Sequence, residues 1–369
     1  MKHLLLSVIL FCSSAAAAAN QQVTQIIQQM SDEQKAAQLI LVYYTTPEFV
    51  LKHEFGGVLI MQNMLKDASK LKAGLKKMQA KSKIDLLVSI DQEGGKVNRM
   101  KRLPNWKNTP SAQTMSNWSN KRITQHASKM AVDLKELGIN LNLAPVLDPS
   151  LDHTGEKAFM HKNKRSFGTG IEQIVPKAGA YIKGFTSQGI GSISKHFPGY
   201  DVQTNSDHDV AVSKASLKSV YKNIQPFEQL ANQATGVMIS SIHYQQFSDA
   251  PAVMSKQMVS LARESHPNGI LMTDDLWGEA LRSWVKAKGN KSTNKQVLAL
   301  TKGALEAGND MLMITYPEKA VLMIKAISKW MKADENMRKR VNDSVFQILI
   351  NKQNLGLLAT KKLATKEIH

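Results

Sequence analysis

The sequence has a single cysteine, Cys12, among its 369 residues. Cys12 lies in the leader described below, so we expect a mature chain without cysteine. Such a chain has no disulfide bonds, no thiolate metal ligands and no cysteine nucleophile. Its stability must then come from the packed core alone.

Long apolar runs and nucleic-acid motifs are also missing. No stretch of about 20 apolar residues follows the leader, so the mature chain has no candidate transmembrane helix. The formal charge is +18, but the lysines are scattered, without an arginine-rich arm or a basic stretch interleaved with aromatics. We therefore expect no nucleic-acid partner. The charge favours solubility and attraction to anionic surfaces, including those of a cell envelope.

Motifs for phosphate, dinucleotide and metal binding are absent as well. The stretch "EGGK" at 93–96 lacks the spacing of a phosphate or dinucleotide loop. A metal-dependent hydrolase built on His196, His208, His243 and Asp274 has no His-x-His or His-Glu-x-x-His spacing to support it. We expect neither a metal nor a cofactor.

Residues 1–19 have the pattern of a secretory signal peptide. Lys2 precedes an apolar stretch that ends at Cys12, and small residues lead up to Ala19. This order predicts cleavage after Ala19 and a periplasmic or secreted protein that starts at residue 20. A lipoprotein acylated on Cys12 is less favoured, because the bulky Phe11 precedes the cysteine.

Eight short apolar runs alternate with helical patterns along the rest of the chain. This alternation predicts an α/β fold, a single (β/α)8 TIM-type barrel in one domain over residues 20–369. The first connection, 45–56, is short for a crossover helix, and residues 336–358 predict a closing helix. The runs are 39–44, 56–61, 85–91, 140–148, 191–197, 236–242, 269–275 and 310–315.

Polar side chains stand at the carboxyl ends of five of these runs. In a barrel of this kind the chemistry lies at those ends, so the pattern predicts a polar mouth. Helix capping could account for one or two of the acids, and Asp275 suits a cap better than Asp274. The residues are Asp91, Asp148, Lys195 with His196, His243, and Asp274 with Asp275.

Seven motifs in a fixed order resemble those of glycoside hydrolase family 3, and above all its single-domain β-N-acetylhexosaminidase branch. The resemblance runs from about Gln38 to Leu357. Larger members carry an acid/base glutamate on a second domain, and from its length we expect this chain to supply the proton donor from the barrel. The motifs are "DQEGGKVNRM", "LAPVLDPS", "KRSFG", "SKHFPG", "VMISSIHY", "MTDDL" and "LEAGNDMLM".

The resemblance implies a retaining glycosidase with Asp274 as nucleophile. Such an enzyme needs a carboxylate that attacks the anomeric carbon and holds a covalent intermediate. For Arg99 and Arg165, loop-holding salt bridges are an alternative to substrate contact. Met238, His243 and Asp148 match family positions, where packing is as good an interpretation as substrate contact, and Trp106 and Trp118 suit loop anchors better than sugar platforms. The substrate-binding residues that the resemblance implies are Asp91, Arg99, Arg165, Lys195 and His196.

The loop after "KHFPG" carries an Asp-x-His dyad in the hexosaminidase branch. Counting from Lys195, the acid/base histidine falls on His208. The aspartate position falls on Ser206, with Asp207 between them. A serine offers no charge to stabilise a protonated imidazole. Ser206 and Asp207 are the candidate partners that orient His208, and Asp209 is a further alternative.

The implied function is removal of β-linked N-acetylglucosamine from a carbohydrate substrate, either murein (peptidoglycan) fragments or chitin-like sugars. Two alternatives stay open. Ser206 also suits a family member that binds glycans without turnover, and no motif defines an acetamido pocket, so a β-glycosidase of another sugar specificity is the second.

Overall fold

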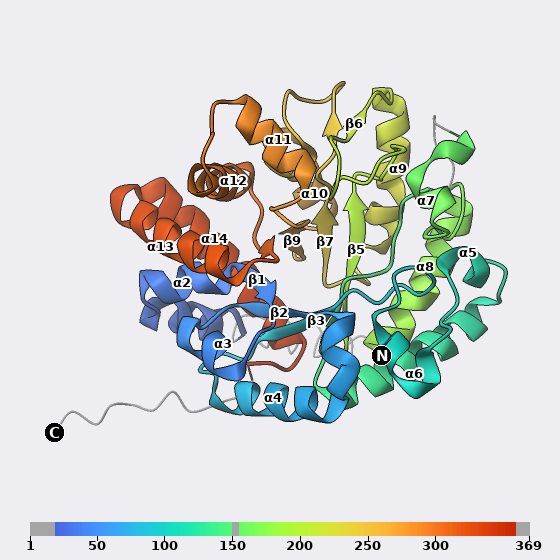
Figure 1. Cartoon of the computed structure of the whole chain (residues 1–369), viewed down its shortest axis with the longest axis horizontal. Coiled ribbons are helices and arrows are strands. Elements are labelled where there is room, and N and C mark those ends of the chain that lie inside the picture. The colour runs from blue at the N-terminus through green and yellow to red at the C-terminus, as the bar shows by residue number, and fades with distance from the viewer. Residues whose placement is uncertain (1–18, 150–154, 359–369) are drawn as a thin grey trace, which may run out of the picture.

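The computed structural model describes residues 19–149 and 155–358 (Figure 1). The predicted signal peptide lies outside these residues except for Ala19, which belongs to a helix over residues 19–29. Among the described helices, none has both the length and the apolar character that crossing a membrane requires.

Eight parallel strands form the predicted barrel, and each of the eight apolar runs contains one of them. Their order in the sheet is β10-β1-β2-β3-β4-β5-β7-β9. The sheet closes through a parallel bridge between Met272 and Met311, where Met311 N donates to Leu271 O at 3.1 Å. The strands are β1 (Ile40–Tyr43), β2 (Gly57–Ile60), β3 (Leu87–Ile90), β4 (Leu141–Asn142), β5 (Gly191–Phe197), β7 (Gly236–Ile239), β9 (Ile270–Thr273) and β10 (Leu312–Ile314).

The strands are buried along almost their whole length, because side chains fill the barrel on one face and helices cover the other. Every residue of β2, β5 and β7 is buried. Such strands read as continuous apolar runs rather than alternating ones, which is why the sequence reveals them. Gly57 is required in β2, since a Cβ there would lie 2.7 Å from Leu87 O. Large polar side chains are therefore concentrated at the strand ends.

Helices surround the barrel (Figure 1). They are α2 (Asp32–Gln38), α3 (Pro47–His53), α4 (Ala68–Lys81), α5 (Ala112–Met115), α6 (Asn120–Leu137), α7 (Phe159–Lys162), α8 (Ile171–Thr186), α9 (Leu217–Leu230), α10 (Lys256–Ser265), α11 (Glu279–Ala287), α12 (Thr293–Ala307), α13 (Pro317–Ala333) and α14 (Glu335–Asn354). Short 3-10 helices are η1 (Gln62–Asp67), η2 (Arg99–Arg102), η3 (Pro104–Trp106), η4 (Gly155–Lys157) and η5 (Ala252–Met254).

The first crossover is short, as the sequence indicates, but it is complete. Helix α3 begins after Thr46, whose side chain accepts a hydrogen bond from Phe49 N, and Pro47 occupies the first turn, where its missing N–H costs nothing. The chain then returns in parallel, with Leu41 of β1 opposite Gly57 of β2.

Helix α14 is the predicted closing helix, and it packs against the beginning of the chain. Arg338 Nη1 and Nη2 donate to the carboxylate of Asp32 in α2, at 2.7 and 3.2 Å. Near the other end of α14, the buried Lys352 Nζ donates to Gln38 Oε1 at 2.7 Å. These contacts join the two ends of the fold beside β1 and β10.

Two short strands lie outside the barrel, β6 (Val212–Ser213) and β8 (His243–Tyr244), and they pair in parallel. The predicted run 236–242 therefore ends early, because β7 stops at Ile239. His243 belongs to β8, and its Nε2 lies 2.7 Å from Ser248 O. The expectation that His243 stands at a barrel strand end in the mouth is wrong for this reason.

Candidate active site

The carboxyl ends of the strands surround a cavity of about 160 Å³. Eight of the nine residues that the sequence assigns to the site line this cavity. The ninth, His208, does not line it, and its side chain is exposed. The eight are Asp91, Arg99, Arg165, Lys195, His196, Ser206, Asp207 and Asp274.

Lys195 on β5 lies between two carboxylates that follow β3. Its Nζ is 2.7 Å from Glu93 Oε1 and also donates to Asp91 Oδ1. Burial favours the neutral amine, but the charges of Asp91 and Glu93 outweigh it and raise the pKa of Lys195 above its ordinary value. Lys195 is therefore a fixed positive charge in the wall of the cavity.

Glu93 also holds Arg165, which it contacts through both carboxylate oxygens. Arg165 Nε and Nη2 donate to Glu93 at 2.9 and 2.8 Å, the fork geometry in which a guanidinium binds a carboxylate most strongly. Burial opposes ionisation of Glu93, but Arg165 and Lys195 hold its pKa well below the usual range. The structure thus gives Arg165 the loop-holding salt bridge as well as a place in the cavity wall.

Asp91 directly follows β3 and completes this network. Its Oδ2 accepts a hydrogen bond from Arg99 Nη2 at 2.9 Å. Arg99 begins the 3-10 helix η2, so the contact also holds that loop against the barrel. The carboxylate is partly exposed within the cavity, where sugar hydroxyls would find both an acceptor and neighbouring donors.

His196 is oriented by the fully buried carboxylate of Asp148. The ring Nδ1 lies 2.6 Å from Asp148 Oδ2, while Oδ1 accepts the backbone N–H groups of His196 and Tyr200 at 2.9 and 2.8 Å. A carboxylate can only accept, so Nδ1 carries a proton and donates it to Asp148. Asp148 therefore acts on the cavity through His196.

Asp274 and Asp275 follow β9 and have different partners. Asp274 Oδ1 accepts from Asp275 N at 2.8 Å. Burial and the nearby charge of Asp207 raise the pKa of Asp274 to about 6, and the opposing effect of His196 is smaller. Asp275 accepts from Thr315 Oγ1 at 2.7 Å and from Trp277 N at 3.0 Å. Asp275 thus holds a turn before α11 and is not the residue that caps this helix.

The turn at 205–208 forms one side of the cavity. Asn205, Ser206 and Asp207 line it, and His208 faces solvent. Ser206 is buried, and its N–H donates to the Tyr200 hydroxyl at 2.8 Å. In this structure neither Ser206 nor Asp207 can orient His208 within the cavity, because the imidazole is not there.

Two residues that hold the cavity wall in place are missing from the sequence-based prediction. Glu93 had a readable signal, since it is a second carboxylate two residues after Asp91. Tyr200, whose hydroxyl fixes the turn, had none. Trp106 and Trp118 are anchors, as expected: Trp106 Nε1 donates to Asp133 at 2.5 Å, and Arg122 lies 3.9 Å over the Trp118 ring.

No metal centre is found in residues 19–149 and 155–358, where no group of three or more His, Cys, Asp or Glu side chains is placed to hold an ion. The cavity residues instead pair with each other, as carboxylate with lysine, guanidinium or imidazole. The arrangement suits recognition of hydroxyl groups and transfer of protons.

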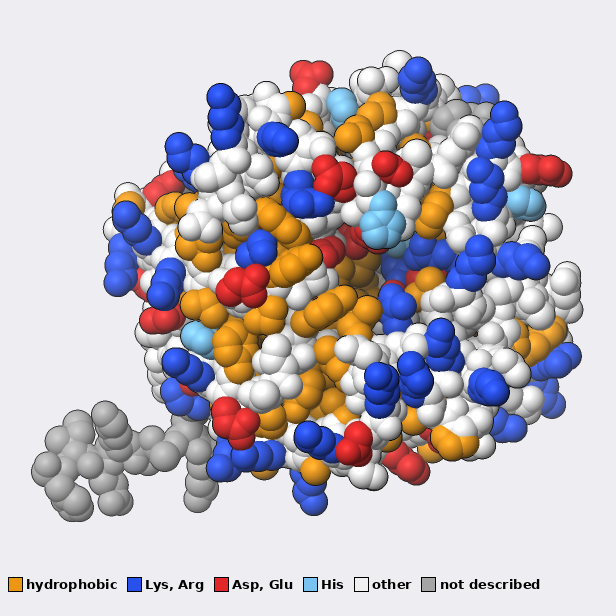
Figure 2. Space-filling view, in the orientation of Figure 1, with side chains coloured by type: hydrophobic (Ala, Val, Ile, Leu, Met, Phe, Trp, Pro, Cys, Tyr) orange, Lys and Arg blue, Asp and Glu red, His pale blue; other side chains and the backbone are white. Residues whose placement is uncertain are grey.

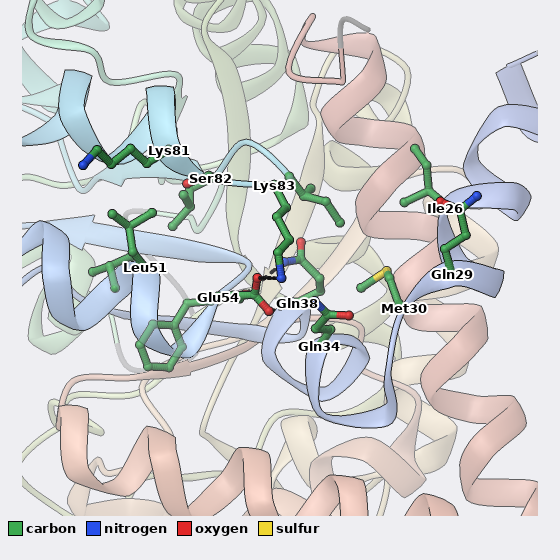
Figure 3. Close-up of a pocket in the computed structure, with 14 residues that line it drawn as sticks. Ile26, Gln29, Met30, Gln34, Gln38, Leu51, Glu54, Lys81, Ser82 and Lys83 are labelled. Atoms are coloured by element: carbon green, nitrogen blue, oxygen red, sulfur yellow. Dashed lines mark hydrogen bonds and ion pairs between the residues drawn. The ribbon is translucent and has the colours of Figure 1, made fainter. Parts of the chain in front are cut away.

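A larger cavity, about 1070 Å³, lies at the opposite end of the barrel, where the strands begin (Figure 3). Its polar groups bind one another: Lys83 Nζ is 2.7 Å from Glu54 Oε1, and Gln34 Nε2 donates to Glu54 Oε2 at 2.8 Å. Size alone would favour this cavity, but barrel enzymes carry their chemistry at the carboxyl ends of the strands. The smaller cavity, with its acids and His196, is the candidate active site.

Basic side chains are spread over the face drawn in Figure 2, among acidic and apolar ones, rather than gathered in a single patch. This distribution matches the scattered lysines of the sequence. Dispersed positive charge attracts anionic surfaces at long range without forming a shaped site. Attraction to an anionic cell-envelope surface therefore stays a prediction.

Comparison with known proteins gives a consistent result. Residues 31–350 match the model of the glycosyl hydrolase family 3 N terminal domain. A beta-hexosaminidase of Glaesserella parasuis is 28% identical over 283 residues, which cover 74% of this chain and 78% of that protein. A beta-hexosaminidase of Pseudomonas aeruginosa is 29% identical over 235 residues, or 62% of this chain and 68% of that protein.

Solved structures share the fold. The crystal structure of a beta-N-acetylhexosaminidase from Beutenbergia cavernae superposes with a TM-score of 0.76 and 26% sequence identity. The superposition covers 88% of this chain and 99% of that one.

Proposed function

Because the chain belongs to glycosyl hydrolase family 3, we propose that it is a retaining β-N-acetylhexosaminidase, which removes a terminal β-linked N-acetylglucosamine. The similar beta-hexosaminidases support this activity. The observation that carries it is the position of Asp274, at the end of β9 and inside a cavity lined by Asp91, Lys195 and His196.

Asp274 is the proposed nucleophile. Its Oδ1 is held by Asp275 N at 2.8 Å, which leaves Oδ2 to attack the anomeric carbon. In the first step the glycosidic bond breaks, the leaving oxygen takes a proton from an acid, and a glycosyl ester forms on Asp274. In the second step water replaces the ester and returns a proton to the same group. Counting from Lys195, the family resemblance implies His208 as this acid, but His208 does not line the cavity.

The remaining wall residues would hold the sugar. Asp91 would accept hydrogen bonds from ring hydroxyls, while Lys195 and Arg99 donate to them. His196 would hydrogen-bond a hydroxyl through Nε2, and Arg165 keeps Glu93 and Lys195 in place. The cavity, about 160 Å³, is smaller than the roughly 300–1,000 Å³ of most small-molecule sites. This size favours a single sugar residue over a chain.

The natural substrates that we propose are murein fragments or chitin-like sugars outside the cytoplasm. The leader pattern of residues 1–19 supports a periplasmic or secreted location. The formal charge of +18 supports attraction to the anionic polymers of a cell envelope.

Hydrolysis of 4-nitrophenyl β-N-acetylglucosaminide tests the proposal directly. We expect the wild type to release 4-nitrophenol, and Asp274→Asn to lose at least about 1,000-fold in kcat because it lacks the nucleophile. The exposed Asp209→Asn serves as the matched control and should retain wild-type activity. Wild-type turnover no greater than that of Asp274→Asn would reject the proposal.

A member that binds glycans without turnover is the second candidate, and the position of His208 outside the cavity favours it. Calorimetry with N-acetylglucosamine separates the two. Binding without release of 4-nitrophenol supports the second candidate. Faster turnover of another aryl glycoside, such as a β-glucoside, would instead mean that the enzyme is a glycosidase of another sugar specificity.

A further inference from the structure

The turn at 205–208 presents Asp207 to the cavity, where counting along the sequence placed His208. Asp207 and Asp274 line the same cavity from two different elements, the turn after β5 and the end of β9. Asp207 and the next residue, His208, are both exposed, but only Asp207 lines the cavity. The group that faces the proposed nucleophile is thus a carboxyl group.

Hydrogen bonds to the neighbouring helix fix this register. Glu279 N and Ala280 N belong to the first turn of α11, where N–H groups have no partner within the helix. They donate to Asp207 O and Ser206 O, both at 3.1 Å. Turning His208 inward would shift these two carbonyl groups and leave the start of α11 unsatisfied.

Bonds within the turn act in the same direction. The Tyr200 hydroxyl accepts from Ser206 N and donates to Thr204 O, both at 2.8 Å. Asp207 N donates to Asn205 Oδ1 at 3.1 Å, and His208 N donates to Asn205 O at 3.0 Å. The turn is therefore held on the barrel side by Tyr200 and on the outer side by α11.

We propose that Asp207, and not His208, is the acid/base of this enzyme, an inference that rests on the proposed function. Protonated Asp207 gives its proton to the glycosidic oxygen as the bond to the anomeric carbon breaks and Asp274 forms the ester. The Asp207 carboxylate then takes a proton from water, whose oxygen attacks the anomeric carbon and releases Asp274. Two carboxyl groups are sufficient for retaining hydrolysis, and no imidazole is required.

The electrostatics of the cavity agree with such a pair. Burial raises the pKa of Asp274, and the charge of Asp207 raises it further. The two side chains are thus close enough for the charge of Asp207 to act on the proposed nucleophile.

The test compares two substrates of the full-length protein: 2,4-dinitrophenyl β-N-acetylglucosaminide, whose leaving group needs no proton, and N,N′-diacetylchitobiose, whose leaving group does. For Asp207→Ala we expect kcat/KM to fall about 100- to 10,000-fold on the disaccharide, the usual contribution of a general acid. On the dinitrophenyl substrate it should fall less than about 10-fold. Azide should raise kcat of this variant and give a glycosyl azide of retained configuration, which a merely structural loss would not do.

His208→Ala is the competing variant and Asp209→Asn the matched control in the same turn, and we expect both to remain within about 3-fold of wild type on both substrates. Asp207→Asn keeps the side-chain shape, so it should lose activity as Asp207→Ala does while keeping the stability of the wild type. Substrate-dependent loss and azide rescue in His208→Ala, with Asp207→Asn unaffected, would overturn the inference and leave the proposed function intact. If the wild type hydrolyses neither substrate faster than Asp274→Asn, the proposed function itself fails.

Discussion

The ring of His196 is fixed by the carboxylate of Asp148, whose second oxygen also binds the backbone N–H of the same histidine. Asp148 thereby keeps a proton on Nδ1 of His196. Asp148→Asn would place an amide N–H₂ or a neutral oxygen opposite Nδ1, so that the imidazole either loses its partner or transfers its proton to Nε2. A buried polar group without its partner costs about 1–3 kcal/mol.

We therefore expect Asp148→Asn to lower kcat/KM for an aryl β-N-acetylglucosaminide by about 5- to 150-fold. Nitrogen NMR of the histidine ring should show more protonation at Nε2. His243→Gln is the control, since its ring contacts Ser248 O outside the cavity. Unchanged kinetics in Asp148→Asn would mean that His196 does not contribute through its tautomer.

Asp274 should reduce stability at neutral pH. Its pKa is about 6 in the folded protein, against an ordinary value of 3.8. A raised pKa means that the folded state holds the proton more tightly, so its stabilising effect is complete below about pH 4 and is lost as the pH rises through 6. The difference sets a ceiling of about 3 kcal/mol.

Asp274→Asn should accordingly increase the free energy of unfolding by about 1–3 kcal/mol at pH 7 and lose this advantage near pH 4. Urea unfolding at pH 4, 5, 6 and 7 measures the trend, and the exposed Asp209→Asn supplies the baseline. A variant that is less stable than wild type at pH 7 would show that the nucleophile position is not electrostatically strained.

The fold could be predicted because each barrel strand lies within a continuous apolar run, a consequence of burial on both faces. The limits of strand β4 could not be predicted from the sequence. Its run, 140–148, yields only Leu141–Asn142 as a strand, since Pro145 has no N–H for the ladder and the chain turns toward the mouth. Strands β6 and β8 have two residues each, too few for any periodicity.

The site shows the same division between strands and loops. Asp91, Lys195, His196 and Asp274 stand at strand ends, so the barrel itself places them. The turn at 205–208 has no such constraint, because its register depends on Tyr200 and on the first turn of α11. Counting along the chain therefore gives His208 as the residue of this loop that belongs to the site, whereas the structure presents Asp207 to the cavity.

Glu93 should contribute strongly to stability, because it neutralises two buried cations. Glu93→Gln leaves Arg165 without its carboxylate, and Lys195 keeps only Asp91. Breaking one side of a buried ion pair costs about 3–5 kcal/mol. Urea unfolding at pH 7 should show a loss of that size for Glu93→Gln.

The double variant Glu93→Gln with Arg165→Met provides the matched comparison. It removes both partners, so it should be more stable than Glu93→Gln alone, although an arginine contact is also lost. Two results would contradict this expectation: a cost below about 1 kcal/mol for Glu93→Gln, or a double variant whose loss of stability equals the sum of the two single losses. Either would mean that Glu93 and Arg165 do not stabilise the fold as a buried ion pair.

Lys352 lies at the other end of the barrel, and its shifted pKa should make stability rise with pH, whereas that of Asp274 makes stability fall. Its side chain is fully buried against Gln38 Oε1, and burial lowers its pKa from 10.5 to about 7. Between these two values the unfolded chain holds a proton that the folded chain does not, so stability rises with pH from about 7 to 10. Below pH 7 the folded protein must bury the charge.

Lys352→Met removes that cost and also the hydrogen bond to Gln38. We expect the variant to exceed wild type by roughly 1–3 kcal/mol in free energy of unfolding at pH 6, and to lose this gain by pH 9.5 because the wild-type lysine is then neutral. The exposed Lys325→Met is the control, and it should show the wild-type pH dependence. Parallel stability curves for Lys352→Met and wild type between pH 6 and 9.5 would mean that Lys352 keeps an ordinary pKa despite its burial.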